Sequence, residues 1–180
     1  MKLRHLLILA TVFAVVPALS FGQETIIASG NSKKEKSLSY SIINEYGFSV
    51  GGVGAYPFLE GTGVLVNGIR FNKTREEVGI GIGVNFFYFS SSERAYPIFL
   101  NYRYYFSSKT KLKPLINVAI GTQLRFFDYE GERQTRELGF YGTIATGFKV
   151  EAISFTPGLF IKSRRGDLHS GIEIKAGFTF

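Results

Sequence analysis

His169, Ser170 and Glu173 bring a histidine, a hydroxyl and a carboxylate close together near the end of the chain. Nucleophilic catalysis needs the histidine within hydrogen-bond reach of the serine, and the acid must orient the histidine. Neighbouring side chains of an extended strand point to opposite faces, so Ser170 and Glu173, three positions apart, would point away from each other. We therefore predict no catalytic residues. A lipid-hydrolysing enzyme built around His169 is the alternative, and it requires a loop conformation at this place.

Other groups that could react or bind a metal are scarce in this sequence. The chain has no cysteine and only two histidines, of which His5 lies in the N-terminal segment. This composition provides no thiolate metal site, no disulfide framework and no attachment point for an N-terminal lipid. The glycines alternate with apolar residues and form no phosphate-binding loop followed by a lysine. We expect no metal and no cofactor.

A further set of residues has the chemistry of ion pairs. These charged residues occupy polar positions in segments where polar and apolar residues alternate: Glu45, Arg70, Arg103, Arg125, Lys149, Glu173 and Lys175. An eight-stranded barrel is only wide enough for its own side chains, so these residues inside one should form a paired polar network that fills it. We expect Glu45 to pair with Lys175, because their strands would meet when the barrel closes; Arg70 and Glu173 are the alternative partners. A narrow pore and a specific anion site are the other interpretations.

The alternation that would position these residues is strictest in residues 171–180, where every even position is apolar and every odd position is polar or glycine. A tilted strand needs this pattern when lipid covers one face and a polar lumen the other. A period of two recurs in eight segments, at residues 38–51, 61–72, 78–89, 97–106, 115–127, 138–150, 152–162 and 171–180. The sequence thus predicts an all-β fold, an eight-stranded antiparallel up-and-down transmembrane β-barrel.

Several residues interrupt the alternation. Ile43, Val64 and Val66 place apolar side chains on the face that is otherwise polar. Pro157 has no amide hydrogen to donate within a strand, and an unpaired carbonyl is costly in hydrocarbon. We therefore expect a bulge or a bend at this proline.

Glycines occupy one whole face of the third segment, at Gly79, Gly81 and Gly83. Glycine weakens a strand and is typical of places where another group approaches the backbone closely. This stripe indicates that the barrel interior leaves little room for side chains at these positions. A soluble, lipocalin-like barrel with the faces inverted is an alternative, but it would expose this stripe to water.

The first residues have the pattern of a secretory signal. Lys2 and Arg4 precede an apolar run at residues 6–16, and small residues follow where a peptidase would cut, after Ser20 or Gly22. The run is much shorter than the roughly 20 residues of a membrane-spanning helix, so an uncleaved anchor is the less favoured alternative. We expect a signal peptide at residues 1–22, a flexible polar lead-in at 23–37 and the barrel at 38–180.

The formal net charge of +7 does not indicate nucleic-acid binding, because the basic residues are scattered singly along the chain.

Three motifs carry a resemblance to a known family. Residues 61–72 read GTGVLVNGIRFN, residues 78–84 read VGIGIGV, and residues 103–106 read RYYF. The chain resembles the small outer-membrane β-barrel domain family of Gram-negative bacteria over residues 38–180. The resemblance implies export through the periplasm, insertion among outer-membrane lipids, and recognition of Phe180 by the outer-membrane assembly machinery. It implies no particular activity.

Both chain ends would then be periplasmic, which sorts the connections into two sets. The outer loops are expected at residues 52–60, 90–96, 128–137 and 163–170, and the inner turns at 73–77, 107–114 and 150–152. Four arginines of the outer loops would lie near anionic lipopolysaccharide, with solvated loop charge as the alternative: Arg133, Arg136, Arg164 and Arg165. We predict a monomeric, non-enzymatic outer-membrane protein with a structural, adhesive or surface-protective role. A lipid-modifying enzyme and a narrow pore or small-ligand transporter are the alternatives.

Overall fold

The computed structural model describes residues 38–52, 58–88, 93–127, 135–164 and 166–180. The expected signal peptide and lead-in lie outside the described residues, as do Arg133 and Arg165. No helix in the described parts of the chain is long and apolar enough to cross a membrane.

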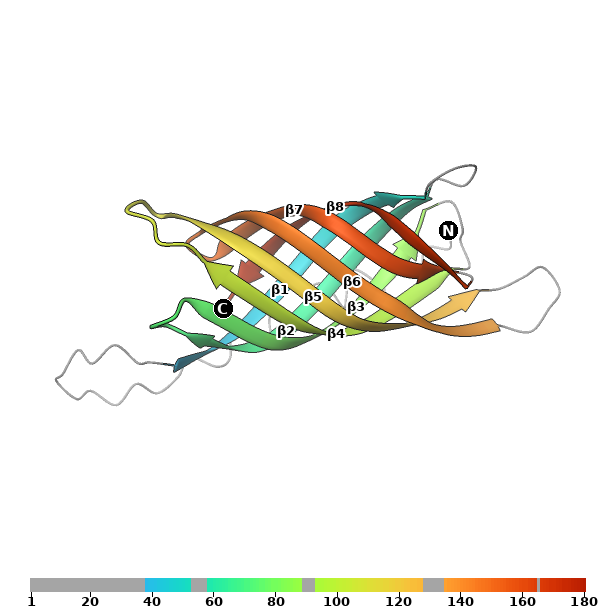
Figure 1. Ribbon diagram of the computed structural model, residues 1–180, viewed down its shortest axis with the longest axis horizontal. Helices are drawn as coiled ribbons and strands as arrows, with labels where there is room; N and C mark the ends of the chain where they lie inside the picture. The colour runs from blue at the N-terminus through green and yellow to red at the C-terminus, as the bar shows by residue number, and fades with distance from the viewer. Residues whose placement is uncertain (1–37, 53–57, 89–92, 128–134, 165) are drawn as a thin grey trace, which may run out of the picture. The chain divides into compact units, whose positions relative to one another are not determined.

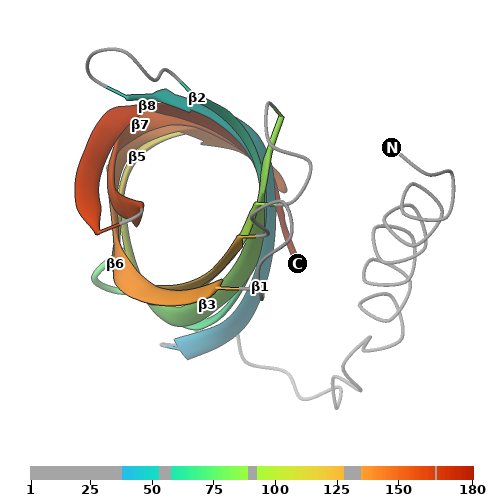
Figure 2. The same ribbon diagram turned by 90° about the vertical axis from the view of Figure 1, so that its right-hand side faces the viewer.

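Eight antiparallel strands form a closed barrel in which each strand pairs with its neighbours in sequence and β8 pairs with β1. The strands are β1 (Leu38–Gly51), β2 (Phe58–Phe71), β3 (Glu76–Phe87), β4 (Arg94–Tyr105), β5 (Leu112–Phe127), β6 (Thr135–Val150), β7 (Ile153–Arg164) and β8 (Asp167–Thr179). Figure 1 shows them tilted alike, and Figure 2 shows the closed ring that they form. The predicted fold class is confirmed.

The tilt of the strands follows from their register. Moving from each residue to the residue opposite it on the next strand leads once around the barrel and back to β1, but ten residues further along it. The path runs Ser41, Gly68, Gly79, Asn101, Ala119, Thr143, Phe160, Gly171, Gly51. An eight-stranded barrel with this stagger has strands tilted by roughly 40° and an interior that side chains can fill.

The two faces of the wall have opposite chemistry. Along β8, Ile172, Ile174 and Phe178 are exposed on the outside, while Glu173 and Lys175 are buried inside. Every other strand also carries exposed large apolar side chains on its outer face. A lipocalin-like barrel requires the reverse arrangement, so that alternative is wrong.

The connections at one end of the barrel are shorter than the sequence predicts. The loop expected at residues 163–170 is a tight turn, because β7 continues to Arg164 and β8 begins at Asp167. Gly166 permits this turn with a φ of 82°, and its amide donates a 2.8 Å hydrogen bond to Glu137. Strands β2, β4 and β6 also extend further than predicted toward the same end.

No bulge forms at Pro157. The β6–β7 ladder has the same register on both sides of the proline, with Ala145 opposite Gly158 and Phe148 opposite Phe155, and the two pairs between them are missing. A bulge would insert a residue and shift the register. Of the bulge or bend expected here, the bulge is absent: the ladder toward β6 has a short gap at the proline, while Pro157 keeps its place opposite Ile174 of β8.

The glycine stripe of β3 marks a close approach, as predicted. A Cβ atom at Gly81 would overlap the ring of Phe99, and one at Gly83 would lie 2.8 Å from the Gly63 carbonyl oxygen. The aromatic ring from β4 therefore lies directly against β3, in space that only a glycine leaves open.

Candidate functional site

The barrel interior is the part of this molecule where charged groups gather, and it holds five carboxylates and seven cations among the described residues. The carboxylates are Glu45, Glu60, Glu77, Glu93 and Glu173, and the cations are Arg70, Arg103, Arg125, Lys149, Lys162, Arg164 and Lys175. All seven residues expected to line the lumen lie on the inward face. Glu60, Glu77, Glu93, Lys162 and Arg164 were not expected there.

Two ion pairs hold the middle of the barrel. Arg103 of β4 reaches across the lumen to Glu45 of β1, with 2.8 Å between Nη2 and Oε1. Lys175 instead binds Glu173, two residues away on the same face of β8, at 2.7 Å. Both pairs are almost completely buried. The expected pair between Glu45 and Lys175 is wrong, because the long arginine spans the narrow interior and takes the carboxylate.

An apolar cluster shares the middle of the barrel with these pairs. It consists of Ile43, Val64, Val66, Phe99, Ala119 and Tyr141. The rings of Phe99 and Tyr141 stack with their centroids 5.0 Å apart. The three aliphatic members with large side chains are the residues that interrupt the alternation in the sequence. The interruptions therefore mark the apolar filling of the lumen.

The mouth on the side of loops 52–57, 88–93, 128–134 and 165–166, which we call the loop end, has its own network. Lys162 binds Glu60 at 2.6 Å. Glu93 binds two arginines, Arg125 at 2.6 Å and Arg164 at 2.8 Å. Arg164 was expected at the outer surface near lipopolysaccharide, and this expectation is wrong, because its guanidinium points inward onto Glu93.

Glu93 precedes β4 and lies among these two arginines. Burial alone would raise the pKa of its carboxyl, but the hydrogen bonds and charges of Arg164 and Arg125 lower the pKa below its ordinary value of 4.5. The charged form of the carboxylate is therefore the one that this network stabilises.

Aromatic rings complete the loop end. Phe58, Phe87, Phe160 and Ala95 form a buried cluster there. The Arg164 guanidinium lies 5.0 Å from the centroid of the Phe58 ring and 5.1 Å from that of Phe87. Arginine gains from such contacts through the negative face of the ring.

The histidine, serine and carboxylate considered for catalysis do not assemble. His169 packs edge-on against Phe58, with ring centroids 5.8 Å apart. Ser170 is exposed, and Glu173 is buried and bound to Lys175. No hydrogen bond among the described residues joins the three side chains. The described residues also contain no group of three or more histidine, cysteine or acidic side chains that could hold a metal ion.

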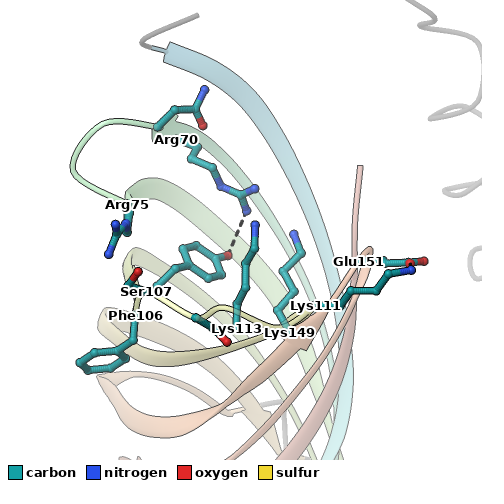
Figure 3. A pocket seen from close by; sticks show the side chains of 11 residues that line it. Arg70, Arg75, Phe106, Ser107, Lys111, Lys113, Lys149 and Glu151 are labelled. Carbon is teal, nitrogen blue, oxygen red and sulfur yellow. Dashed lines mark hydrogen bonds and ion pairs between the residues drawn. The ribbon is translucent and has the colours of Figure 1, made fainter. Parts of the chain in front are cut away.

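The opposite mouth, which we call the terminus end, lies on the side of the turns 72–75, 106–111 and 151–152. Arg70 binds Glu77 at 2.7 Å, and the Tyr105 hydroxyl donates to the same carboxylate at 3.0 Å. A third donor, Ser41, binds the other oxygen at 3.0 Å. Beside this network is a cavity of about 580 Å³, whose lining includes five basic residues and which is shown in Figure 3.

Phe180 completes the seam between the first and last strands. Its amide donates to the Ile42 carbonyl oxygen at 2.9 Å, and its carbonyl oxygen accepts from the Ile42 amide at 3.1 Å. Its side chain is exposed on the outside of the barrel. Arg136, near the start of β6, is also exposed, and its guanidinium lies 5.8 Å from the Phe126 ring centroid.

The fold has known counterparts among solved structures. The crystal structure of Neisserial surface protein A (NspA) is similar with a TM-score of 0.58 and 11% identity, over 81% of this chain and 100% of that one. The N-terminal β-barrel domain of Pseudomonas aeruginosa OprF is similar with a TM-score of 0.51 and 14% identity, over 78% of this chain and 97% of that one. No family model matches the sequence, and no curated protein matches it.

Proposed function

We propose, from the small outer-membrane barrel fold that this chain shares with those proteins, that it is an integral outer-membrane protein with a structural, adhesive or surface-protective role and no enzymatic activity. The observation that carries the proposal is the apolar outer surface. Large apolar side chains are exposed on all eight strands, among them Tyr40, Ile69, Ile80, Leu100, Ile120, Ile144, Leu159 and Ile172. Soluble monomers rarely expose contiguous apolar patches of more than a few hundred Å².

The interior favours a barrel whose lumen is filled over a barrel that forms a pore. Stacked rings of Phe99 and Tyr141 and the cross-lumen pair of Glu45 and Arg103 occupy its middle. A conducting pore of this type needs a larger, water-filled interior, as in barrels of 16 or more strands. We therefore propose that the lumen is filled and conducts no ions at a rate typical of porins.

The outer surface is proposed to face lipopolysaccharide at the loop end. Exposed cations gain about 1 kcal/mol each near an anionic lipid surface. Arg136 is the exposed member of the expected basic set within the described residues. The assembly machinery is proposed as a second partner, through Phe180, which is exposed at the end of the closing strand.

Cell fractionation with alkaline extraction tests the location of the protein. The mature protein should stay with outer membranes after carbonate treatment and should migrate differently on a gel before and after heating. Release by carbonate or by salt would contradict membrane insertion. Conductance measured in planar bilayers tests the closed lumen, and discrete channels at every insertion event would contradict it and favour the pore.

Arg136→Ala tests the contact with lipopolysaccharide. Binding of the folded barrel to lipopolysaccharide micelles should weaken relative to the control Lys109→Ala, which removes an exposed cation at the opposite end that does not line the cavity there. Equal binding by both variants would contradict the contact at Arg136.

A further inference from the structure

The cavity at the terminus end has an unusual excess of positive charge. Five basic side chains and one carboxylate line it: Arg70, Arg75, Lys111, Lys113, Lys149 and Glu151. Two of the cations have a partner, because Arg70 binds Glu77 at 2.7 Å and Lys111 binds Glu151 at 3.1 Å. Within the described part of the chain, Arg75, Lys113 and Lys149 have no carboxylate at ion-pair distance.

Lys149 is the most telling of the three, because its side chain is buried. Only 6% of the residue is exposed, although no carboxylate pairs with its amino group among the described residues. The nearby Glu77 carboxylate is bound by Arg70, Tyr105 and Ser41 and forms no ion pair with Lys149. A buried charge without a partner is costly, and proteins usually pair such a group with a counter-ion.

The three unpaired cations line the same cavity from three separate elements. Lys149 is near the end of β6, Lys113 is near the start of β5, and Arg75 lies in the turn between β2 and β3. Figure 3 shows Lys113 and Lys149 side by side, with their amino groups extending in the same direction. The turn holds Arg75 by its backbone, since its amide donates to Phe71 at 2.8 Å and its carbonyl accepts from Tyr105 at 2.9 Å.

We propose that this cavity binds a phosphate group of an anionic ligand, and that Lys149, Lys113 and Arg75 are the side chains that hold it. A carboxylate neutralises one of three cations, whereas a phosphate monoester carries a charge of about −1.5 to −2 and three strong acceptor oxygens. Arginine and lysine are the usual partners of phosphate in proteins. The volume of about 580 Å³ exceeds what a bare phosphate needs and is typical of small-molecule sites.

The rim of the cavity favours a phospholipid headgroup as the source of that phosphate. Phe106 lines the cavity and is 42% exposed, and its ring packs edge-on against Tyr104 at a centroid distance of 5.1 Å. Aromatic side chains of this kind belong to the interface between lipid and water in barrel proteins. This step rests on the proposed location, because short turns face the periplasm in outer-membrane barrels and the headgroups would be those of the inner leaflet.

Anion titration of the full chain, folded in detergent micelles, tests the phosphate site. Calorimetry with inorganic phosphate and with pyrophosphate should show saturable binding, tighter for pyrophosphate. Lys149→Met removes the buried charge and keeps an unbranched side chain one atom shorter, and it should weaken pyrophosphate binding by about tenfold or more. The matched control is Lys109→Met, which removes an exposed lysine of the 106–111 turn that does not line the cavity, and it should change the affinity less than about twofold.

Unfolding in urea separates a lost site from a lost fold. Lys149→Met should unfold at the same or a higher urea concentration than the wild type, because it removes an unpaired buried charge. Absence of saturable binding to the wild type, or equal affinities of the wild type and Lys149→Met, would overturn the proposal. Glutarate, a dicarboxylate, serves as the comparison anion without phosphate. If glutarate binds as tightly as pyrophosphate, the assignment of the site to phosphate would be overturned.

Native mass spectrometry from lipid nanodiscs distinguishes the two sources of phosphate. The protein is released from nanodiscs that contain phosphatidylcholine and phosphatidylglycerol. The wild type and Lys109→Met should each be detected with one phosphatidylglycerol still bound, whereas Lys149→Met should be detected without bound lipid. Pyrophosphate binding without retained lipid would support the site with a soluble phosphate compound as its ligand. Titration in micelles does not depend on where the protein resides in the cell, so failure of the membrane location would be seen separately by fractionation.

Discussion

The ion pair between Arg103 and Glu45 should be one of the strongest single couplings in the barrel. Its charged atoms are 2.8 Å apart, and both side chains are almost fully buried. At an effective dielectric constant of about 20, two unit charges at this distance attract by roughly 6 kcal/mol, most of which offsets the cost of removing them from water. Removing one partner leaves the other charge buried alone, which costs about 3 to 5 kcal/mol.

A double-mutant cycle measures this coupling. Glu45→Gln and Arg103→Met should each lower the free energy of unfolding by about 3 kcal/mol or more, and the double variant should lose far less than the sum. The chain has no tryptophan, so unfolding in urea is best followed by circular dichroism and by the gel mobility of the folded form.

The control for this cycle is the pair of Lys111 and Glu151, which are 3.1 Å apart but 83% and 71% exposed. Their coupling should stay within about 1 kcal/mol, as for other exposed pairs. Additivity of Glu45→Gln and Arg103→Met within about 0.5 kcal/mol would refute the cross-lumen pair. A larger coupling of Glu45 with Lys175 than with Arg103 would restore the pairing expected from the sequence.

Three further predictions concern other parts of the barrel. Gly81→Ala should destabilise the fold by about 1 to 3 kcal/mol, because the new methyl group would overlap the Phe99 ring. The control Gly61→Ala, whose new methyl group would have its nearest neighbour at 3.3 Å, should cost less. Urea unfolding that ranks the two variants in reverse would contradict the close approach at Gly81. Because folding lowers the pKa of Glu93, its contribution to stability is complete above pH 4.5 and is lost as the pH falls through the pKa that the carboxyl has in the folded protein. The wild type should therefore lose more stability than Glu93→Gln on acidification below about pH 4.5, and parallel pH profiles of the two would contradict this. Deletion of Phe180 should reduce the amount of folded protein in cells, while the urea midpoint of protein refolded in vitro should change little. Unchanged cellular yields would contradict a role for Phe180 as an assembly signal.

The wall of the barrel could be predicted from the sequence because it depends on a local pattern. The period of two, set by lipid on one side and a narrow interior on the other, fixes which face each residue of β8 occupies. The same rule correctly places Arg103 and Arg125 inside. Pattern breaks were informative as well, since Ile43, Val64 and Val66 became the apolar filling.

The partners inside the lumen could not be predicted, because they depend on side chains that cross the interior. Neighbouring strands suggested Lys175 for Glu45, but Arg103 reaches Glu45 from β4, which is not paired with β1. Strand ends were also hard to place. Glu60 was assigned to an outer loop but lies in β2, which turns its carboxylate toward Lys162. Glu93 does lie in the loop before β4, and its carboxylate turns inward to Arg164.

Lipid exposure of the outer face is the central claim of this account, and spin labelling measures it directly. Because the chain has no cysteine, single changes such as Ile98→Cys, Ile120→Cys and Ile144→Cys give one labelled position each without background. These side chains are 57%, 56% and 54% exposed on the outer faces of β4, β5 and β6. In lipid vesicles, labels at all three sites should be accessible to dissolved oxygen and protected from a water-soluble nickel reagent. Labels that the nickel reagent reaches as readily as it reaches one at exposed Lys109 would contradict a membrane-spanning barrel.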